Sequence, residues 1–268
     1  MENLFNVAEN KNFKIEKKER LPDNEAQILG EIRAEFMELC RKDAIKHLNE
    51  HLTLPGFRKG MIPEDVLVKT VGEMRVLEEV AEVALAREYE NIIIDSEFRP
   101  MMRPEISVTK LAPKNPLTFI IKLVLEPEVS LPDYKKLASE TKVEADETKA
   151  GQAGSSNSQG EMKEKRRLKI LETIVKETKL KLPKKFVEHE MNHLLHHFKE
   201  DLGKAGIKWE DYLAKAEKKE EEIRETWREH VENRAKTELI LARIAEKEGA
   251  KTYLDIFELL EKESSEAK

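Results

Sequence analysis

The sequence predicts an α+β protein, in which a mixed N-terminal domain precedes an all-helical one. Two runs of apolar residues, 106–111 and 117–125, have the length and spacing of strands. Elsewhere, apolar residues recur at spacings of three and four, which is typical of amphipathic helices. Between the two regions, residues 150–160 have no hydrophobic period and indicate a linker. We expect a first domain over residues 1–139, a flexible linker over 140–164 and a helical domain over 165–268.

The first element is expected to be an edge strand. Phe13 and Ile15 are followed by alternating charges up to Leu21, so one side of the segment is apolar. Pro22 is expected to open a helix, because its fixed φ suits a helix start. The apolar stripe of that helix follows at spacings of four, four and three: Ile28, Ile32, Phe36 and Leu39. Cys40 lies beside the stripe and is predicted to be a small buried hydrophobe rather than a reactive thiol.

The helix leads into a stretch that cannot be helical. Within residues 54–63, two prolines and two glycines break the helical period. Gly56 and Gly60 permit positive φ, so they are expected to bracket a compact, exposed turn. The residues between them are Phe57, Arg58 and Lys59. Arginine and aromatic residues are frequent binding anchors, whereas in an ordinary loop these three would be a hydrophobic plug and two solvated charges.

A second helical pattern is predicted from Pro63 to about Ile94, with an interruption near Gly72. The two predicted strands follow it, separated by a proline-containing connection over residues 112–116 that is typical of a hairpin. The expected element order of the first domain is therefore β-α-α-β-β, and the 54–63 loop joins its two helices.

The last part of the chain is predicted to be entirely helical. A short amphipathic helix covers residues 168–175, and another opens at Pro183. A short helix is expected around Trp209, followed by a long charged helix that ends at Gly249. A final apolar segment covers residues 253–260.

Composition restricts the function classes. Hydrophobic residues make up 39% and charged residues 38% of the 268 residues, which suits a helix-rich protein with solvated faces. The net charge of −6 argues against general affinity for nucleic acid, since phosphate binding needs clustered positive charge. The single cysteine cannot form an intramolecular disulfide. No signal-peptide run and no bilayer-spanning window is present, so we expect a cytoplasmic protein without a DNA or membrane partner.

The loop carries a specific pattern, Gly56-Phe57-Arg58-Lys59-Gly60-x-x-Pro63. It resembles the ribosome-docking loop of the trigger factor family, bacterial chaperones that sit at the ribosomal tunnel exit. The similarity extends over most of the chain. Residues 14–22 resemble the family's first strand and helix entry, and residues 126–134 resemble its exit from the docking domain. Residues 166–171 and 208–213 resemble its C-terminal helical domain.

The resemblance implies a ribosome-associated chaperone that holds nascent or unfolded polypeptides without ATP. It makes Phe57 and Arg58 the principal docking anchors, with Lys59 adding electrostatic attraction. The residues that would shape the loop are Gly56, Gly60 and Pro63. The implied receptors are the large-subunit protein beside the tunnel exit and adjacent ribosomal RNA, and no cofactor is implied. A weak homodimer is an alternative hypothesis, because free members of the family can self-associate.

The sequence departs from the family in two places. Typical members carry a prolyl-isomerase domain where this chain has the linker, and such a domain needs at least ~50 residues to hold its own core. The linker 140–164 contains no aromatic residue to line a proline pocket. We therefore predict that isomerase activity is absent, with retained activity as the alternative. The segment after Gly249 is also short, so the second of the family's two helical arms is expected to be truncated or missing.

One further motif points to a different chemistry. His189-Glu190-Met191-Asn192-His193 matches the H-E-x-x-H pattern of zinc peptidases, in which two histidines on one helix face bind zinc and the glutamate activates water. A catalytic zinc also needs a third ligand and a dry cavity. The motif histidines point away from the apolar stripe Val187, Met191, Leu194 and Phe198. We predict no metal site and no catalytic residue, and keep a zinc-dependent peptidase as the alternative.

Overall fold

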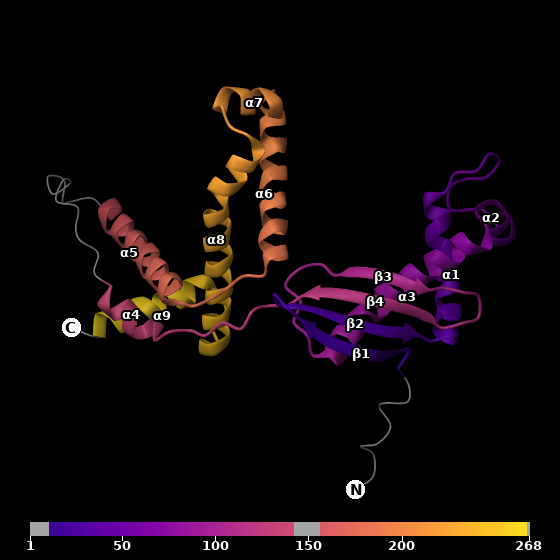
Figure 1. Cartoon of the computed structure of the whole chain (residues 1–268), viewed down its shortest axis with the longest axis horizontal. Coiled ribbons are helices and arrows are strands. Elements are labelled where there is room, and N and C mark those ends of the chain that lie inside the picture. Colours follow the sequence, from indigo (N-terminus) through magenta and orange to yellow (C-terminus); the bar gives the residue numbers. More distant parts are fainter. Residues whose placement is uncertain (1–10, 142–155, 267–268) are drawn as a thin grey trace, which may run out of the picture. The chain divides into compact units, whose positions relative to one another are not determined.

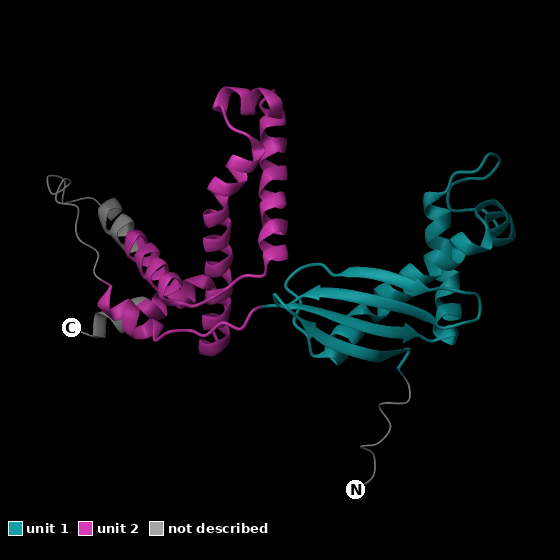
Figure 2. Ribbon diagram, in the orientation of Figure 1, with its two compact units in different colours: residues 1–126 teal, residues 127–268 magenta. Residues whose placement is uncertain are grey.

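The computed structural model describes residues 11–141 and 156–266. The chain divides into two compact units, residues 1–126 and 127–268 (Figure 2). The division lies before the domain boundary expected at residue 139, because helix α4, Tyr134–Glu140, packs against helices of the second unit. Most of the expected linker, residues 142–155, lies outside the described residues, and its last part belongs to helix α5, Ser156–Glu177.

The first unit is an antiparallel sheet with three helices (Figure 1), which confirms the predicted α+β class. The sheet has strand order β1-β2-β4-β3. Its strands are β1, Phe13–Leu21; β2, Glu25–Ile32; β3, Glu105–Lys110; and β4, Leu117–Val124. The helices are α1, Ala34–His51; α2, Glu64–Val71; and α3, Glu73–Ser96. Gly72, with φ of 87°, breaks the helical path between α2 and α3 where an interruption was predicted.

Strand β2 corrects one prediction, because its residues were expected to open the first helix. Ile28 and Ile32 are four residues apart, an even spacing that places both on one face of a strand as readily as on one face of a helix. Asp23 and Asn24 both have positive φ, 61° and 56°, as in the two-residue turns that join hairpin strands. The turn is closed by the Glu25 amide, which donates to the Pro22 carbonyl at 3.4 Å. Pro22 therefore begins a hairpin turn rather than a helix.

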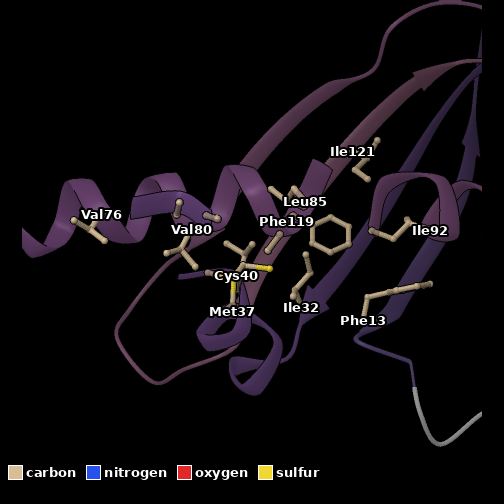
Figure 3. Packing of buried hydrophobic residues seen from close by; sticks show 14 of the residues in the cluster. Phe13, Ile32, Met37, Cys40, Val76, Val80, Leu85, Ile92, Phe119 and Ile121 are labelled. Atoms are coloured by element: carbon tan, nitrogen blue, oxygen red, sulfur yellow. The ribbon is translucent and has the colours of Figure 1, made fainter. Parts of the chain in front are cut away.

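The core of this unit lies between one face of the sheet and helices α1 and α3 (Figure 3). Phe119 on β4 is 1% exposed and Ile121 is fully buried. The Phe119 ring packs directly against the backbone of Gly30 on β2, since a Cβ at position 30 would lie 2.7 Å from the ring. Cys40 on α1 is fully buried, as predicted, and this burial raises the pKa of its thiol.

In the part of the second unit that the structure describes, every regular element is a helix, as predicted, and α4 and α5 are among them. Its other helices are α6, Lys184–Lys204; α7, Trp209–Ala216; α8, Glu220–Glu248; and α9, Tyr253–Glu266. Helix α4 packs mainly on α9 and also on α5. Tyr134, at the start of α4, is 2% exposed, and its hydroxyl donates to Glu248 Oε1 at 2.5 Å. None of the described helices is long and apolar enough to cross a membrane.

Candidate functional site: the loop between α1 and α2

The connection between α1 and α2, residues 52–63, is called the docking loop below, after the role that its sequence resemblance implies (Figure 1). Its tip, residues 56–61, is exposed along its whole length. Gly56 and Gly60 have φ of 87° and 82°, the positive values that the two glycines were expected to supply. A Cβ at either position would meet nothing within 4 Å, so glycine is required here by the backbone angle and not by crowding.

The base of the docking loop is anchored in the core of the first unit. Leu52 and Leu54 are partly buried and pack against that core. On the return side of the loop, residues 60–63, which lead into α2, Ile62 is 3% exposed. Pro63 is the N-cap residue of α2, and two acidic residues follow it in the first helical turn, where they complement the helix dipole. The tip therefore projects from a base that is fixed on both sides by hydrophobic contacts.

Hydrogen bonds give the docking loop a defined conformation. Within the tip, the Phe57 amide donates to the Leu54 carbonyl at 3.2 Å, and the Met61 amide donates to the Arg58 carbonyl at 2.9 Å. Asn49, in the last turn of α1, holds the return side. Its side chain donates to the Ile62 carbonyl at 2.7 Å and accepts from the Ile62 amide at 3.1 Å.

The structure brings the predicted site residues together on one exposed tip, except that Pro63 lies at the entry to α2. Phe57 is 38% exposed, so it is not the buried plug of an ordinary loop. Two neighbours were not predicted. Met61 is 71% exposed beside Gly60, and Asn49 contacts the loop from within a helix. The absence of helical period around Met61 could have indicated its exposure, whereas the contact of Asn49 depends on the folded chain path.

The chemistry of the tip suits binding rather than catalysis. Phe57 and Met61 offer apolar surface, and Arg58 and Lys59 offer positive charge. The docking loop contains no acidic, histidine or cysteine side chain that could act as a base, a nucleophile or a metal ligand. Its local charge is thus positive, although the chain as a whole carries a net charge of −6. Such a tip fits a partner with an apolar pocket and negative potential.

The H-E-x-x-H pattern lies on α6, where His189 and His193 are both exposed. Nε2 of His193 lies 3.2 Å from Nε2 of His197, one turn further along the helix. In the described part of the chain, no group of three or more histidine, cysteine or acidic side chains is placed to hold a metal ion. The zinc-peptidase alternative therefore finds no support in the structure.

Comparisons with known proteins agree with the pattern in the docking loop. A family sequence model described as bacterial trigger factor protein matches residues 13–153, more than half of the chain. A second one, described as the C-terminus of bacterial trigger factor protein, matches residues 136–266. The chain belongs to the trigger factor family.

Curated trigger factors match slightly less than half of the chain. The trigger factor of Mycobacteroides abscessus is 35% identical over 120 residues, 45% of this chain. That of Bacillus subtilis is 32% identical over 122 residues, 46% of this chain. The matched regions span only 24% and 29% of those two relatives.

A solved trigger factor structure shares the fold of this chain. It aligns with a TM-score of 0.52 and 15% sequence identity, and covers 88% of this chain and 86% of the solved one. That trigger factor is described as a chaperone with promiscuous substrate recognition in folding and assembly activities. At this identity the likeness concerns the fold alone, which the two chains share over both compact units.

Proposed function

We propose that the chain is a ribosome-associated chaperone, which docks at the tunnel exit and holds nascent or unfolded polypeptides without ATP. The observation that carries the proposal is the docking loop. It combines the family pattern with an exposed apolar and cationic tip on a rigid base. A tip that is already ordered loses little conformational entropy when it binds, which favours a binding role.

Docking is proposed to depend mainly on Phe57 and Arg58. An aromatic side chain that enters a pocket and an arginine that pairs with a carboxylate or phosphate are the commonest hot spots. Lys59 adds attraction to the large-subunit protein and to adjacent ribosomal RNA. Gly56, Gly60 and Pro63 shape the loop but are not expected to contribute contact energy. Because part of the attraction is electrostatic, docking should weaken as salt is raised.

Client holding is proposed to use apolar side chains that both units leave exposed. In the first unit these include Leu39, Met74, Ile94, Ile106 and Val108. In the second unit they include Leu168, Ile207, Tyr253 and Leu254. Scattered apolar residues on charged surfaces favour weak, reversible and promiscuous contacts.

The end of the α6–α8 hairpin adds a cluster of four half-buried aromatic side chains. The ring of Phe198 lies 5.1 Å from Tyr212, 5.2 Å from Trp227 and 6.2 Å from Trp209, measured between centroids. No residue of α7 is buried. The rings contact one another, Trp227 also packs against the core of the second unit, and the Trp209 indole donates to Glu220 at 3.1 Å. The cluster is therefore a candidate client surface.

We also propose that the chain lacks prolyl-isomerase activity and is not an enzyme. The two family matches overlap over residues 136–153, which leaves no unmatched stretch for a separate domain. Between α4 and α5 lie only residues 141–155, whereas a domain with its own core needs at least ~50 residues. A proline-containing tetrapeptide should therefore isomerise at the uncatalysed rate in the presence of the protein. Acceleration above that rate would refute this part of the proposal.

Two further proposals follow from the family. A chaperone that meets nascent chains at the tunnel exit would work in the cytoplasm. The free protein would form a weak homodimer through the surfaces that otherwise bind ribosomes and clients. Light scattering at increasing protein concentration tests the dimer, and a monomer mass at all concentrations would contradict it.

Co-sedimentation with purified bacterial ribosomes tests the docking. The intact protein should pellet with ribosomes at moderate salt, and Phe57→Ala/Arg58→Ala should not. If both residues are hot spots, the double variant loses about 2 kcal/mol or more of binding free energy. Lys14→Ala/Leu21→Ala is a matched control, because it removes one exposed cation and one exposed apolar side chain from strand β1. Equal pelleting of the docking variant and this control would refute the assignment.

A further inference from the structure

We propose that Asn49 is a positioning residue of the docking loop. Its side chain fixes the backbone of Ile62, so that Phe57 and Arg58 are presented in the conformation that binds. The inference rests on the docking function proposed above. Position 49 lies outside the pattern that runs from Gly56 to Pro63, and its role follows from the contacts that it makes in the folded unit.

Asn49 makes three hydrogen bonds to the return side of the docking loop. The side-chain amide group donates from Nδ2 to the Ile62 carbonyl at 2.7 Å. The side-chain Oδ1 accepts from the Ile62 amide at 3.1 Å. The backbone carbonyl of Asn49 accepts from the Gly60 amide at 3.2 Å, which satisfies a carbonyl in the last turn of α1. One residue of α1 thus pairs with both Gly60 and Ile62.

The side-chain type at position 49 matters because Ile62 presents a donor and an acceptor side by side. A carboxamide offers one acceptor and one donor in the same plane and satisfies both groups. An ionised aspartate would keep the bond from the Ile62 amide but would place a second acceptor against the Ile62 carbonyl. Alanine would leave both groups without this partner in a partly buried position, which is unfavourable.

Fixing Ile62 also fixes the tip. The Ile62 side chain is buried in the core of the first unit, and the Ile62 backbone is held by Asn49. The backbone that follows the tip therefore has a single conformation. At the other end, Leu54 packs on the core and its carbonyl accepts from the Phe57 amide. Without the Asn49 bonds, the tip would sample other conformations and would lose that freedom on binding. Affinity for the partner would fall accordingly.

A double-mutant cycle on the full chain tests the proposal. Ribosome affinity is measured for the wild type and Asn49→Ala, each with and without Phe57→Ala/Arg58→Ala. In the wild-type background, Asn49→Ala should weaken binding roughly fivefold or more, as expected for the loss of preorganising hydrogen bonds. In the docking-variant background it should cost little further affinity, because no anchor remains to be positioned. Equal losses in both backgrounds would overturn the proposal.

Hydrogen exchange on the free protein tests the positioning without ribosomes. In Asn49→Ala, the Ile62 and Gly60 amides should exchange at least ~10-fold faster, and the Ile121 amide in the core should be unchanged. In Asn49→Asp, the Ile62 amide should keep its protection while ribosome affinity falls. Glu50→Ala, an exposed neighbour in the same turn of α1, is the control and should alter neither quantity.

The two measurements separate the failure of the docking function from the failure of the inference. If the wild type does not bind ribosomes, the docking function is refuted. The exchange experiment would then still decide whether Asn49 fixes the docking loop. If the Ile62 amide is equally protected in the wild type and in Asn49→Ala, the positioning role is wrong, whatever the ribosome measurement shows.

Discussion

The substitution Gly60→Ala isolates the role of backbone conformation in the proposed ribosome docking. Gly60 has φ of 82°, and a Cβ at this position would meet nothing within 4 Å. The added methyl group therefore causes no crowding, and its whole effect comes from the left-handed backbone. An L-residue in such a conformation costs about 1–2 kcal/mol relative to its preferred regions.

The loop can respond to this backbone strain in two ways. If the docking loop keeps its conformation, the first unit loses about 1–2 kcal/mol of stability, and its Tm falls by several degrees. If the tip rearranges, stability is nearly unchanged and the cost is shifted to binding. We expect the second outcome, because the tip is exposed and water can replace the hydrogen bond from the Gly60 amide to the Asn49 carbonyl. Ribosome affinity should then fall about 5- to 30-fold, since about 1.4 kcal/mol corresponds to a factor of ten.

The assay is ribosome binding at fixed salt, combined with thermal unfolding of the free protein. Gly203→Ala is a control, because this glycine in α6 also has open space around it but lies in a helix. That variant should keep full affinity and gain up to about 1 kcal/mol in stability. D-alanine at position 60, introduced by semisynthesis, accepts positive φ and should restore binding. Wild-type affinity and wild-type Tm in Gly60→Ala would show that docking does not need the left-handed turn.

Three other perturbations probe the rest of the molecule. Gly30→Ala would place a Cβ 2.7 Å from the Phe119 ring, so the first unit should lose about 1–3 kcal/mol in denaturant unfolding; an unchanged midpoint would contradict the packing. Hydrogen bonds from the Tyr134 hydroxyl and a neighbouring lysine lower the pKa of Glu248. The Glu248 carboxylate therefore stabilises the second unit above the unfolded-state pKa of about 4.3. This stabilisation is lost as the pH falls through the lower folded-state pKa. The difference in unfolding free energy between wild type and Glu248→Gln should therefore shrink from pH 6 to pH 3. A constant difference would show that the Glu248 carboxylate does not stabilise the second unit. Untagged protein with added zinc should show no chelator-sensitive peptidase activity, and any activity lost in His189→Gln would revive the peptidase hypothesis.

The sequence could predict features that are encoded locally. The breaks at Gly56 and Gly60 and the exposed residues between them can be recognised within one short stretch, and the structure places them on a single tip. Strand β2 could not be separated from a helix by the spacing of Ile28 and Ile32 alone, because a spacing of four fits both periods. The residues Asp23 and Asn24 could have indicated a hairpin turn before β2, since residues of these types tolerate positive φ.

Features that depend on the path of the folded chain could not be predicted in this way. Asn49 contacts Ile62, which lies at the far end of the loop that follows it. A helical sequence pattern does not indicate which asparagine will accept a hydrogen bond from a distant backbone amide. The unit boundary was misplaced for the same kind of reason. Residues 134–140 adjoin the first unit in sequence, but their apolar side chains complete the core of the second.

The position of α4 explains how one fold can accommodate different sequences between its parts. Helices α4 and α5 flank residues 142–155, and both contribute to the hydrophobic core of the second unit. Tyr134 ties the start of α4 to the end of α8 through Glu248, and α4 packs against α9. The helices on both sides of residues 142–155 therefore belong to the same unit. Insertions are tolerated where few buried contacts depend on the affected backbone. A chain with a further domain at this position and a chain with a short connection there would both be able to build the same helical unit, since both flanking helices are held by that unit's own core.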